Sequence, residues 1–519
     1  MSFLSHLNPT PGFPSYTGPY QVGSVDVEIP VTDLEAPSPA PDSTIATTAF
    51  RVFYPCEPGA HERPVRWIPN PQRGYVSAYA RFLGAGSAFS ELFSFFPQLL
   101  YYISIPVHRN ARLLPAPTKS ARWPVLVFSH GLGGTRNTYS HLAGSLSSHG
   151  IVVIAPDHRD GSAPIAYVRA TSTSEAREVP YRNVPHKPSP DTWAQRDEQL
   201  KIRLWELGLV HDALLKIDQG APLKNLDPNT PSNGHFHKGG PFDALSLFRN
   251  ALDIHRPGAI TWAGHSFGAA TTVQFVKSVC YRPSAHDAKK HNYTPLFKPS
   301  GDSPLAQQIT PQSPVMLLDL WCLPLHSPAT AWLWAKPLPA YAPSGPGGTA
   351  ILAVLSEAFF KWSSHLRETK RVLSESPTSD HPRRTKPPPR FFYAATSAHL
   401  SQSDFGVLFP WVTKRVFKAE EPVRTLTLNT RAMLQVMREA GIEVAETSKA
   451  DREAAEEGRD DAAIVDPRAG IRGWIPLTTD LDEREEKRLG ERERREDVNR
   501  GPGEAVMEGE VLGQVRSGA

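Results

Sequence analysis

The stretch from Ile260 to Thr271 constrains the fold of this chain more than any other part of the sequence. It begins as a short apolar strand, continues through Gly264–Gly268 with the sequence GHSFG, and ends in small residues that suit a helix. The pattern G-x-S-x-G between a strand and a helix is typical of a strained turn that holds a serine side chain above a sheet. Its two glycines fit because strand and helix approach too closely there for a side chain. A pentapeptide alone is weak evidence, so its surroundings decide its meaning.

Apolar runs that are typical of buried strands alternate with helical segments on both sides of this stretch. These runs begin at Trp123, Ile151, Val315, Ala350 and Phe391. The first of them ends in a His-Gly pair and a glycine-rich turn. A strand, a helix and a second strand at this spacing form a βαβ unit, which calls for a parallel sheet with helices on both faces. We therefore predict an α/β fold with a mostly parallel sheet.

Candidate partners for Ser266 follow at the ends of two later strands. A serine hydroxyl is a weak nucleophile, so it needs a base, and the base needs an acid that orients it. Asp319 ends one buried strand and His399 comes just after the last one. The chain order Ser, Asp, His, with each residue at the carboxyl end of a strand, is that of the α/β-hydrolase fold. We predict this fold, with several loop insertions, and a catalytic triad of Ser266, Asp319 and His399.

Acyl transfer by such a triad also needs two backbone N–H donors for the oxyanion. One is the residue after the nucleophile, Phe267, and the other comes from the loop after the His-Gly strand, where Leu132 is the candidate. The triad has simpler alternatives, because Asp319 could cap a loop and His399 could be structural, with His365 as a weaker rival. Four other polar residues are expected to brace the sheet or to be held by local hydrogen bonds: His130, His158, Asp160 and His265.

Composition excludes several classes of protein. A net charge of +3 over 519 residues, with no basic stripe, gives no reason to expect a nucleic-acid partner. The cysteines at 56, 280 and 322 form neither a disulfide framework nor a metal-ligand pattern. The N-terminus lacks the basic and apolar regions of a secretory signal, and Ser2 stands where N-myristoylation needs glycine. We expect a cytoplasmic protein, at most peripheral to membranes, with no transmembrane segment and no metal or organic cofactor.

The most aromatic segment, Phe89–Ile103, is too short and too interrupted by Pro97 to span a bilayer. It either contacts a lipid surface or packs as a core helix, and both alternatives stay open. Residues 1–57 are expected to form an N-terminal extension with the first strands of the hydrolase domain, and 58–444 the catalytic domain itself. Residues 445–519 are rich in Glu, Arg and Asp and are expected to form a disordered tail.

Several motifs in one fixed order resemble the platelet-activating factor acetylhydrolase family. They are Gly18–Tyr20, Ser129–Gly133, Asp157–Asp160, Arg196–Gln199, Gly264–Gly268, Leu318–Trp321 and Ser397–His399. The resemblance covers roughly residues 15–440. It includes the position of Asp319, directly after the strand that follows the GHSFG helix.

This resemblance implies a calcium-independent phospholipase A2 of the group VII type, an enzyme of lipid degradation. Such enzymes hydrolyse the acetyl group, or a short or oxidised acyl group, at the sn-2 position of phospholipids through an acyl-enzyme. Ser266 would be the nucleophile, His399 the base and Asp319 its partner, with a lipid-interface helix near 89–103.

Ala269 stands where the family commonly has glycine, and large insertions at 281–314, 324–348 and 367–390 border the expected site. The acyl length is therefore open. Two alternatives are a broad-specificity carboxylesterase or lipase that acts on soluble esters, and a catalytically silent scaffold.

Overall fold

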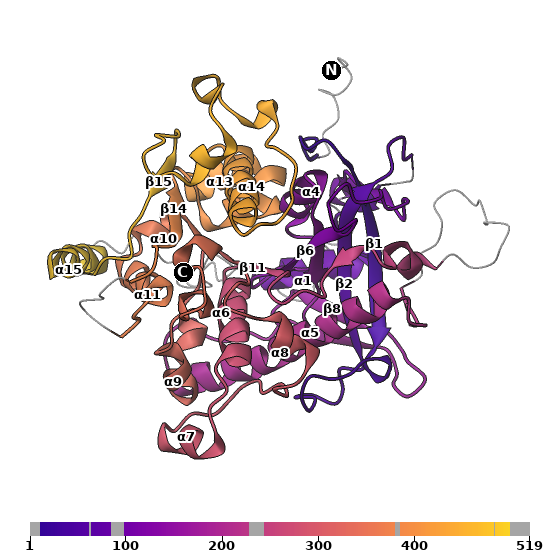
Figure 1. Cartoon of the computed structure of the whole chain (residues 1–519), viewed down its shortest axis with the longest axis horizontal. Coiled ribbons are helices and arrows are strands. Elements are labelled where there is room, and N and C mark those ends of the chain that lie inside the picture. Colours follow the sequence, from indigo (N-terminus) through magenta and orange to yellow (C-terminus); the bar gives the residue numbers. More distant parts are fainter. Residues whose placement is uncertain are drawn as a thin grey trace.

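A mixed sheet forms the centre of the molecule (Figure 1). The structure is a computed structural model that describes residues 11–61, 64–84, 98–227, 243–378, 385–481 and 483–498. Within these residues the sheet has 11 strands in the order β15-β14-β13-β12-β11-β6-β7-β2-β1-β5, with β10 beside β6. The strands are β1 Gln21–Pro30, β2 Thr47–Cys56, β5 His108–Arg109, β6 Trp123–Ser129, β7 Val152–Pro156, β10 Leu252–Asp253, β11 Thr261–His265, β12 Val315–Leu318, β13 Ile351–Ser356, β14 Arg390–Ala394 and β15 Trp474–Pro476. Two separate ribbons are β3 Val65–Arg66 with β4 Ser104–Ile105, and β8 Ile165–Val168 with β9 Arg177–Pro180.

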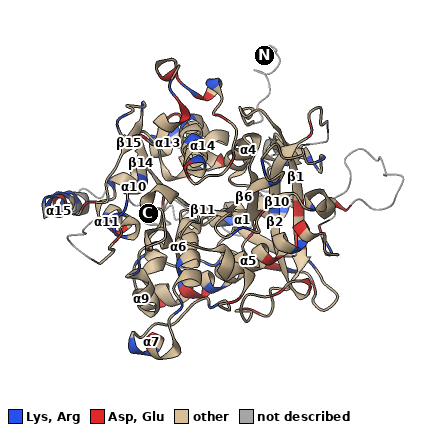
Figure 2. Ribbon diagram, viewed as in Figure 1, with Lys and Arg blue, Asp and Glu red and all other residues tan. Residues whose placement is uncertain are grey.

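The inner strands are parallel and the outer ones are mostly antiparallel. From β7 through β6, β11, β12 and β13 to β14, every neighbouring pair is parallel. By contrast, β1 with β2, β2 with β7, and β14 with β15 are antiparallel pairs. The inner strands are nearly free of charged residues (Figure 2), as strands buried on both faces require. This topology, with the serine strand β11 between β6 and β12, is that of an α/β-hydrolase, and the fold-class prediction is confirmed.

Helices cover both faces of this sheet. Val125 and Val127 of β6 belong to one core cluster with side chains of α5 and α6, whereas Leu126 and Phe128 belong to a second cluster with side chains of α4 and α14. This alternation follows from the two-residue period of a strand. The helices are α1 Gln72–Phe82, α3 Gln98–Tyr102, α4 Ser140–Ser148, α5 Pro190–Gln219, α6 Phe267–Cys280, α7 Ala285–Lys290, α8 Pro304–Gln308, α9 Ala331–Trp334, α10 Glu357–Lys361, α11 Ser363–Leu373, α12 Asp404–Leu408, α13 Pro410–Phe417, α14 Pro422–Glu439 and α15 Glu483–Val498.

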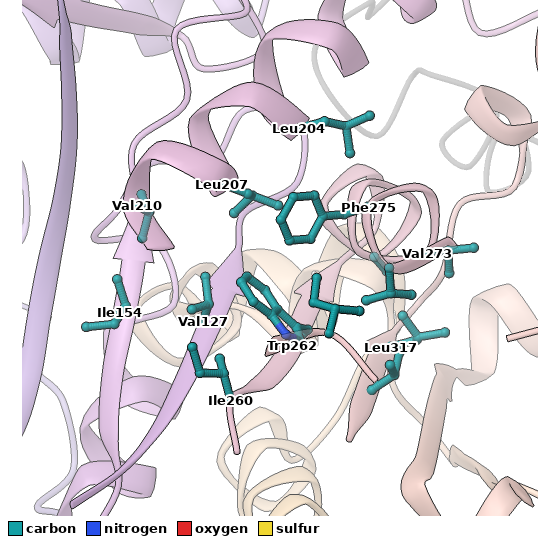
Figure 3. Packing of buried hydrophobic residues seen from close by; sticks show 14 of the residues in the cluster. Val127, Ile154, Leu204, Leu207, Val210, Ile260, Trp262, Val273, Phe275 and Leu317 are labelled. Atoms are coloured by element: carbon teal, nitrogen blue, oxygen red, sulfur yellow. The ribbon is translucent and has the colours of Figure 1, made fainter. Parts of the chain in front are cut away.

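Core packing anchors the strand that leads to Ser266. Trp262 of β11 is buried between the sheet and α6, where its ring lies 4.9 Å from that of Phe275 (Figure 3). Leu207 and Val127 belong to the same cluster. A buried tryptophan removes a large apolar area from water, so β11 and α6 are held firmly on either side of the turn between them.

The long helix α5 begins and ends at the residues that helix chemistry predicts. The hydroxyl of Ser189 accepts a hydrogen bond from the N–H of Thr192 before the first turn, and Gly220 ends the helix with a left-handed φ of 72°. Its buried face carries leucines but also several ionisable residues, among them Arg203 and Glu206. Both turn out to organise the edge of the sheet where the site lies.

The segment after residue 445 corrects one expectation. We expected a disordered tail over 445–519, but β15 completes the sheet and the ring of Trp474 stacks on Phe392 at 5.0 Å. Within the same segment, Glu456 forms a buried ion pair with Arg431 of α14. Charged composition suggested disorder, whereas these charges are paired with the domain and a few apolar residues supply the contacts. Residues 482 and 499–519 lie outside the described part of the chain.

The aromatic segment 89–103 is described only in part. Residues 89–97 lie outside the described residues, so the choice between lipid contact and core packing cannot be read there. The remainder forms α3, where Tyr102 is 60% exposed, followed by the buried Ile103. No described helix combines the length and the hydropathy that a membrane span requires.

Candidate active site

The turn at Ser266 has the strained geometry that the sequence predicts. Ser266 lies between the end of β11 and the start of α6, with φ 57° and ψ −119°. A Cβ on Gly268 would lie 2.0 Å from the carbonyl oxygen of Ser129, so glycine is required where α6 crosses the end of β6. A non-glycine residue in such a conformation costs about 1–3 kcal/mol, which the surrounding structure must offset.

Backbone hydrogen bonds hold the turn to the neighbouring strand. The N–H of Ser266 donates to the carbonyl of Leu318 at 2.9 Å, and the N–H of Trp321 donates to the carbonyl of Ser266 at 3.3 Å. These two bonds flank Asp319, which therefore lies next to the turn. Asp319 also has a positive φ, of 42°, so both ends of this contact are conformationally constrained.

Asp319 and His399 form a buried acid–imidazole pair. Nδ1 of His399 lies 2.8 Å from Oδ2 of Asp319, and the N–H of Ser356 donates to Oδ1 at 2.5 Å. Burial alone would raise the pKa of Asp319, but the imidazoles of His265 and His399 hold it well below the usual range. The ring of His399 also stacks on Phe359 at 4.5 Å, which fixes its plane. An ionised carboxylate on Nδ1 leaves Nε2 of His399 to accept a proton.

The two expected oxyanion donors lie on segments that meet at Ser266. A Cβ on Gly131, the neighbour of Leu132, would lie 3.0 Å from Cβ of Ser266. Phe267 is the first residue of α6, a position whose N–H has no partner inside the helix. The arrangement suits both assignments, and the roles of Leu132 and Phe267 stay predictions.

A fully buried arginine ties these segments together. Arg203 of α5 donates to the carbonyl of His130 at 2.9 Å and to Oδ2 of Asp160 at 2.7 Å. Its guanidinium lies 4.4 Å from the centre of the Phe267 ring. Sequence analysis missed this residue. The available signal was an arginine on the apolar stripe of a long helix, since a buried charge needs partners.

His158, one of the polar residues expected to brace the sheet, is held in a buried chain of hydrogen bonds. His158 Nε2 lies 2.8 Å from Oγ of Ser129, and its Nδ1 lies 2.8 Å from the carboxylate of Glu206. All three side chains are buried, and their hydrogen bonds link β6 to α5. The rival base His365 instead accepts the N–H of Cys322 at Nε2, at 3.2 Å.

Within the described residues, one set of nitrogen and oxygen atoms is close enough to bind a metal ion. It consists of His265, Asp319 and His399, whose atoms lie within 4.8 Å of one another. The 2.8 Å hydrogen bond between Asp319 and His399 already gives this set a use as an acid–base pair.

The comparisons with known proteins identify a family for this chain. The family model described as "Platelet-activating factor acetylhydrolase, isoform II" matches residues 6–331. The chain belongs to this family. The matched range includes Ser266 and Asp319 and ends before His399, and the roles of these three residues stay predictions.

Relatives in this family differ in how much of the chain they match. The "Putative phospholipase A2" of Schizosaccharomyces pombe is 26% identical over 83% of this chain and 92% of its own length. The platelet-activating factor acetylhydrolases of dog (Canis lupus familiaris) and guinea pig (Cavia porcellus) are 31% and 32% identical over 50% of this chain. The chain matches about half, 51%, of the length of each of these two relatives. Among solved structures, a ferulic acid esterase from Streptomyces cinnamoneus aligns with a TM-score of 0.44 at 14% identity, covering 83% of this chain and 93% of that chain.

Proposed function

We propose that this chain is a serine esterase that hydrolyses the acetyl group, or a short or oxidised acyl group, at the sn-2 position of phospholipids. Its family supports the substrate class. The observation that carries the mechanism is the buried hydrogen bond between Asp319 and His399 beside the turn that holds Ser266. A scaffold without catalysis has no need of a strained serine next to such a pair.

The reaction proceeds through an acyl-enzyme. His399 takes the hydroxyl proton of Ser266 while Oγ forms a bond to the ester carbonyl carbon, and the resulting oxyanion accepts hydrogen bonds from the N–H groups of Leu132 and Phe267. The ester C–O bond then breaks, and His399 returns the proton to the departing lysophospholipid oxygen. Water, deprotonated by His399, repeats the sequence to release the acid and regenerate Ser266. In this mechanism side chains and backbone N–H groups of the protein stabilise each developing charge. The proposed activity is therefore calcium-independent.

A lipid surface is the proposed partner, and α13 supports it more directly than residues 89–103. Trp411, Val412 and Val416 of this helix are 70%, 41% and 56% exposed, while Thr413 is its one buried residue. Lys414 and Arg415 lie on the same helix. Exposed aromatic and aliphatic residues next to basic ones are typical of a helix that lies in a membrane interface. Because α13 follows α12 shortly after His399, such contact would bring lipid to the site.

One experiment tests the proposed function against its alternatives. The protein is incubated with a fluorophosphonate probe and assayed on acetyl and long-chain phospholipids and on a soluble p-nitrophenyl ester, with Ser266→Ala as the control. We expect labelling of the natural protein alone and a clear preference for the acetyl phospholipid.

Each other outcome contradicts part of the proposal. Activity on the soluble ester alone would favour a general carboxylesterase, and equal turnover of the long-chain phospholipid would exclude the short-acyl preference. No labelling of the folded natural protein would leave the silent scaffold.

A further inference from the structure

A third imidazole lies against the Asp319–His399 pair. His265 is the last residue of β11 and directly precedes the serine of the turn. The centre of its ring lies 4.3 Å from that of His399, and its Nε2 lies 3.9 Å from Oδ2 of Asp319. On the other side of the ring, Nδ1 lies 2.8 Å from the hydroxyl of Tyr139.

The hydrogen bonds around Tyr139 define where His265 carries its proton. The N–H of Gly131 donates to the hydroxyl oxygen of Tyr139 at 3.1 Å, which leaves the hydroxyl hydrogen for Nδ1 of His265. A neutral imidazole that accepts at Nδ1 carries its hydrogen on Nε2. Among the described residues, Nε2 has no hydrogen-bond acceptor at normal distance, and the carboxylate of Asp319 faces it. Burial, with a further effect of His399, lowers the pKa of His265 to about 4, so the ring is neutral near pH 7.

We propose that His265 and Tyr139 are positioning residues for the acid of the triad. Tyr139 fixes the tautomer of His265, and the Nε2–H of His265 then faces the same oxygen of Asp319 that binds His399. This long-range donor stabilises the charge on the carboxylate of Asp319 and lowers its basicity. The carboxylate therefore attracts the Nδ1 hydrogen of His399 less strongly. The inference rests on the proposed function, because it assigns these two side chains a role within the Ser266 site.

The same contacts connect the acid to the oxyanion loop. Tyr139 binds both the N–H of Gly131, which precedes Leu132, and the ring of His265. Its own ring lies 5.4 Å from that of His265, so packing supports the hydrogen bond. The side chains of Tyr139 and His265 would therefore connect a substrate bound at the oxyanion loop with the carboxylate of Asp319.

Other titratable groups do not duplicate this role. His365 of α11 also faces the region of Asp319, but its Nε2 accepts from a backbone N–H and its ring stacks on Trp362 at 4.6 Å. In the part of the chain that is described, Asp319 lies within 4 Å of ring nitrogens of His265 and His399 and forms an ion pair with no lysine or arginine. The donors to its carboxylate are thus the backbone N–H of Ser356, His399 and, at longer range, His265.

The test uses the pH dependence of fluorophosphonate labelling, which reports activation of the serine whatever the natural substrate. His265→Gln removes the second imidazole, so the carboxylate of Asp319 becomes more basic. The acidic limb of the labelling rate should therefore shift to higher pH by roughly 0.5–1 unit. Tyr139→Phe releases the tautomer of His265, and we expect a smaller shift in the same direction. The matched control is His211→Gln on α5, which removes a buried imidazole whose pKa is likewise lowered to about 4, mainly by burial. The acidic limb of this control should lie at the same pH as in the natural protein.

The alternative roles give different results. If His265→Gln lowers the labelling rate equally at all pH values, the imidazole is only a packing element and the inference is wrong. If that variant does not fold, as judged by circular dichroism, Tyr139→Phe decides the question by the same criterion. Absence of labelling in the natural protein would refute the proposed function instead, so the two failures are distinguishable.

Discussion

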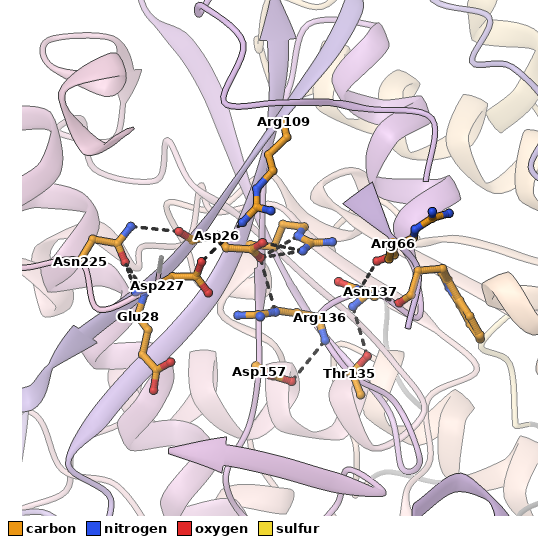
Figure 4. Close-up of polar contacts among 12 residues, drawn as sticks. Asp26, Glu28, Arg66, Arg109, Thr135, Arg136, Asn137, Asp157, Asn225 and Asp227 are labelled. Atoms are coloured by element: carbon orange, nitrogen blue, oxygen red, sulfur yellow. Dashed lines mark hydrogen bonds and ion pairs between the residues drawn. The ribbon is translucent and has the colours of Figure 1, made fainter. Parts of the chain in front are cut away.

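At the scale of single residues, a buried ion pair joins the antiparallel strands β1 and β2 at one side of the sheet. Asp26 of β1 and Arg51 of β2 are direct cross-strand neighbours, both buried, and the guanidinium binds the carboxylate through two nitrogens at 2.7–2.9 Å (Figure 4). Arg136 approaches the same carboxylate at 3.6 Å. Burial would raise the pKa of Asp26, but Arg51 and then Arg136 hold it well below the usual range.

Asp26→Asn should therefore destabilise the protein by about 3–5 kcal/mol near neutral pH, because it leaves Arg51 buried without its counter-charge. A lowered pKa in the folded state contributes stability above the unfolded pKa of about 4, and this contribution is lost as the pH falls below that value. The natural protein should then lose stability on acidification more steeply than the variant. Urea unfolding from pH 7 to pH 3 measures both effects. As a control, Asp253→Asn removes an exposed pair with Arg256 and should change stability by less than about 1 kcal/mol. Equal pH dependence of Asp26→Asn and the natural protein would contradict the assignment.

Sequence predicts which residues lie close together best where the fold itself fixes their positions. Asp319 and His399 could be paired in advance because the carboxyl ends of parallel strands meet at one edge. The connection between Ser129, His158 and Glu206 could not be predicted. It repeats the order serine, histidine, acid in space, yet Glu206 comes from the middle of a helix and all three are buried. Ser129 ends a strand, whereas Ser266 occupies the strained turn between β11 and α6, and this difference separates the brace from the proposed catalytic site.

At the scale of elements, β15 shows why composition misjudged the chain beyond residue 445. The segment has the charge content of a disordered chain, but three residues of it, Trp474 to Pro476, suffice to pair with β14. So short a strand gives no periodic signal. Some of its glutamates pair with arginines of α14, as Glu456 does with Arg431 and Glu453 with Arg424. These partners lie far apart in the sequence.

Truncation separates the two parts of this segment. Deletion of 445–519 removes β15, exposes Phe392 and breaks the buried pair of Arg431, so we expect a loss of about 3 kcal/mol or more and poor recovery of folded protein. Deletion of 499–519 keeps β15 and Glu456, and we expect it to leave the melting temperature and the esterase activity unchanged. Thermal unfolding by circular dichroism compares the two. If the protein without residues 445–519 were as stable as the natural protein, β15 would be dispensable.

At the scale of the whole molecule, the described surface exposes few large apolar side chains, and α13 has three of them. The others above one-third exposure are dispersed over different elements: Leu83, Tyr102, Val423 and Ile475. Scattered exposed residues are ordinary, whereas a cluster on one helix indicates a contact surface. The sequence analysis looked for this surface in the aromatic segment 89–103. Exposed residues of α13 could not be singled out from sequence because a short amphipathic helix looks the same whether its apolar side is covered or open.

If α13 enters a lipid interface, Trp411→Ser with Val416→Ser should weaken binding to vesicles by roughly 100-fold or more. Burial of each such side chain contributes about 1.5–3 kcal/mol, and 1.4 kcal/mol is a factor of ten. Flotation with phosphatidylcholine vesicles, with and without phosphatidylserine, measures this loss. The anionic lipid should strengthen binding through Lys414 and Arg415. Hydrolysis of vesicle-borne acetyl phospholipid should fall in parallel, while turnover of a soluble ester stays the same because no residue of α13 belongs to the site.

Val423→Ser on α14, 41% exposed in the natural protein, is the matched control and should bind normally. A double variant that binds vesicles as well as this control would exclude α13 as the lipid contact, and loss of soluble-ester turnover would show that α13 supports the site itself.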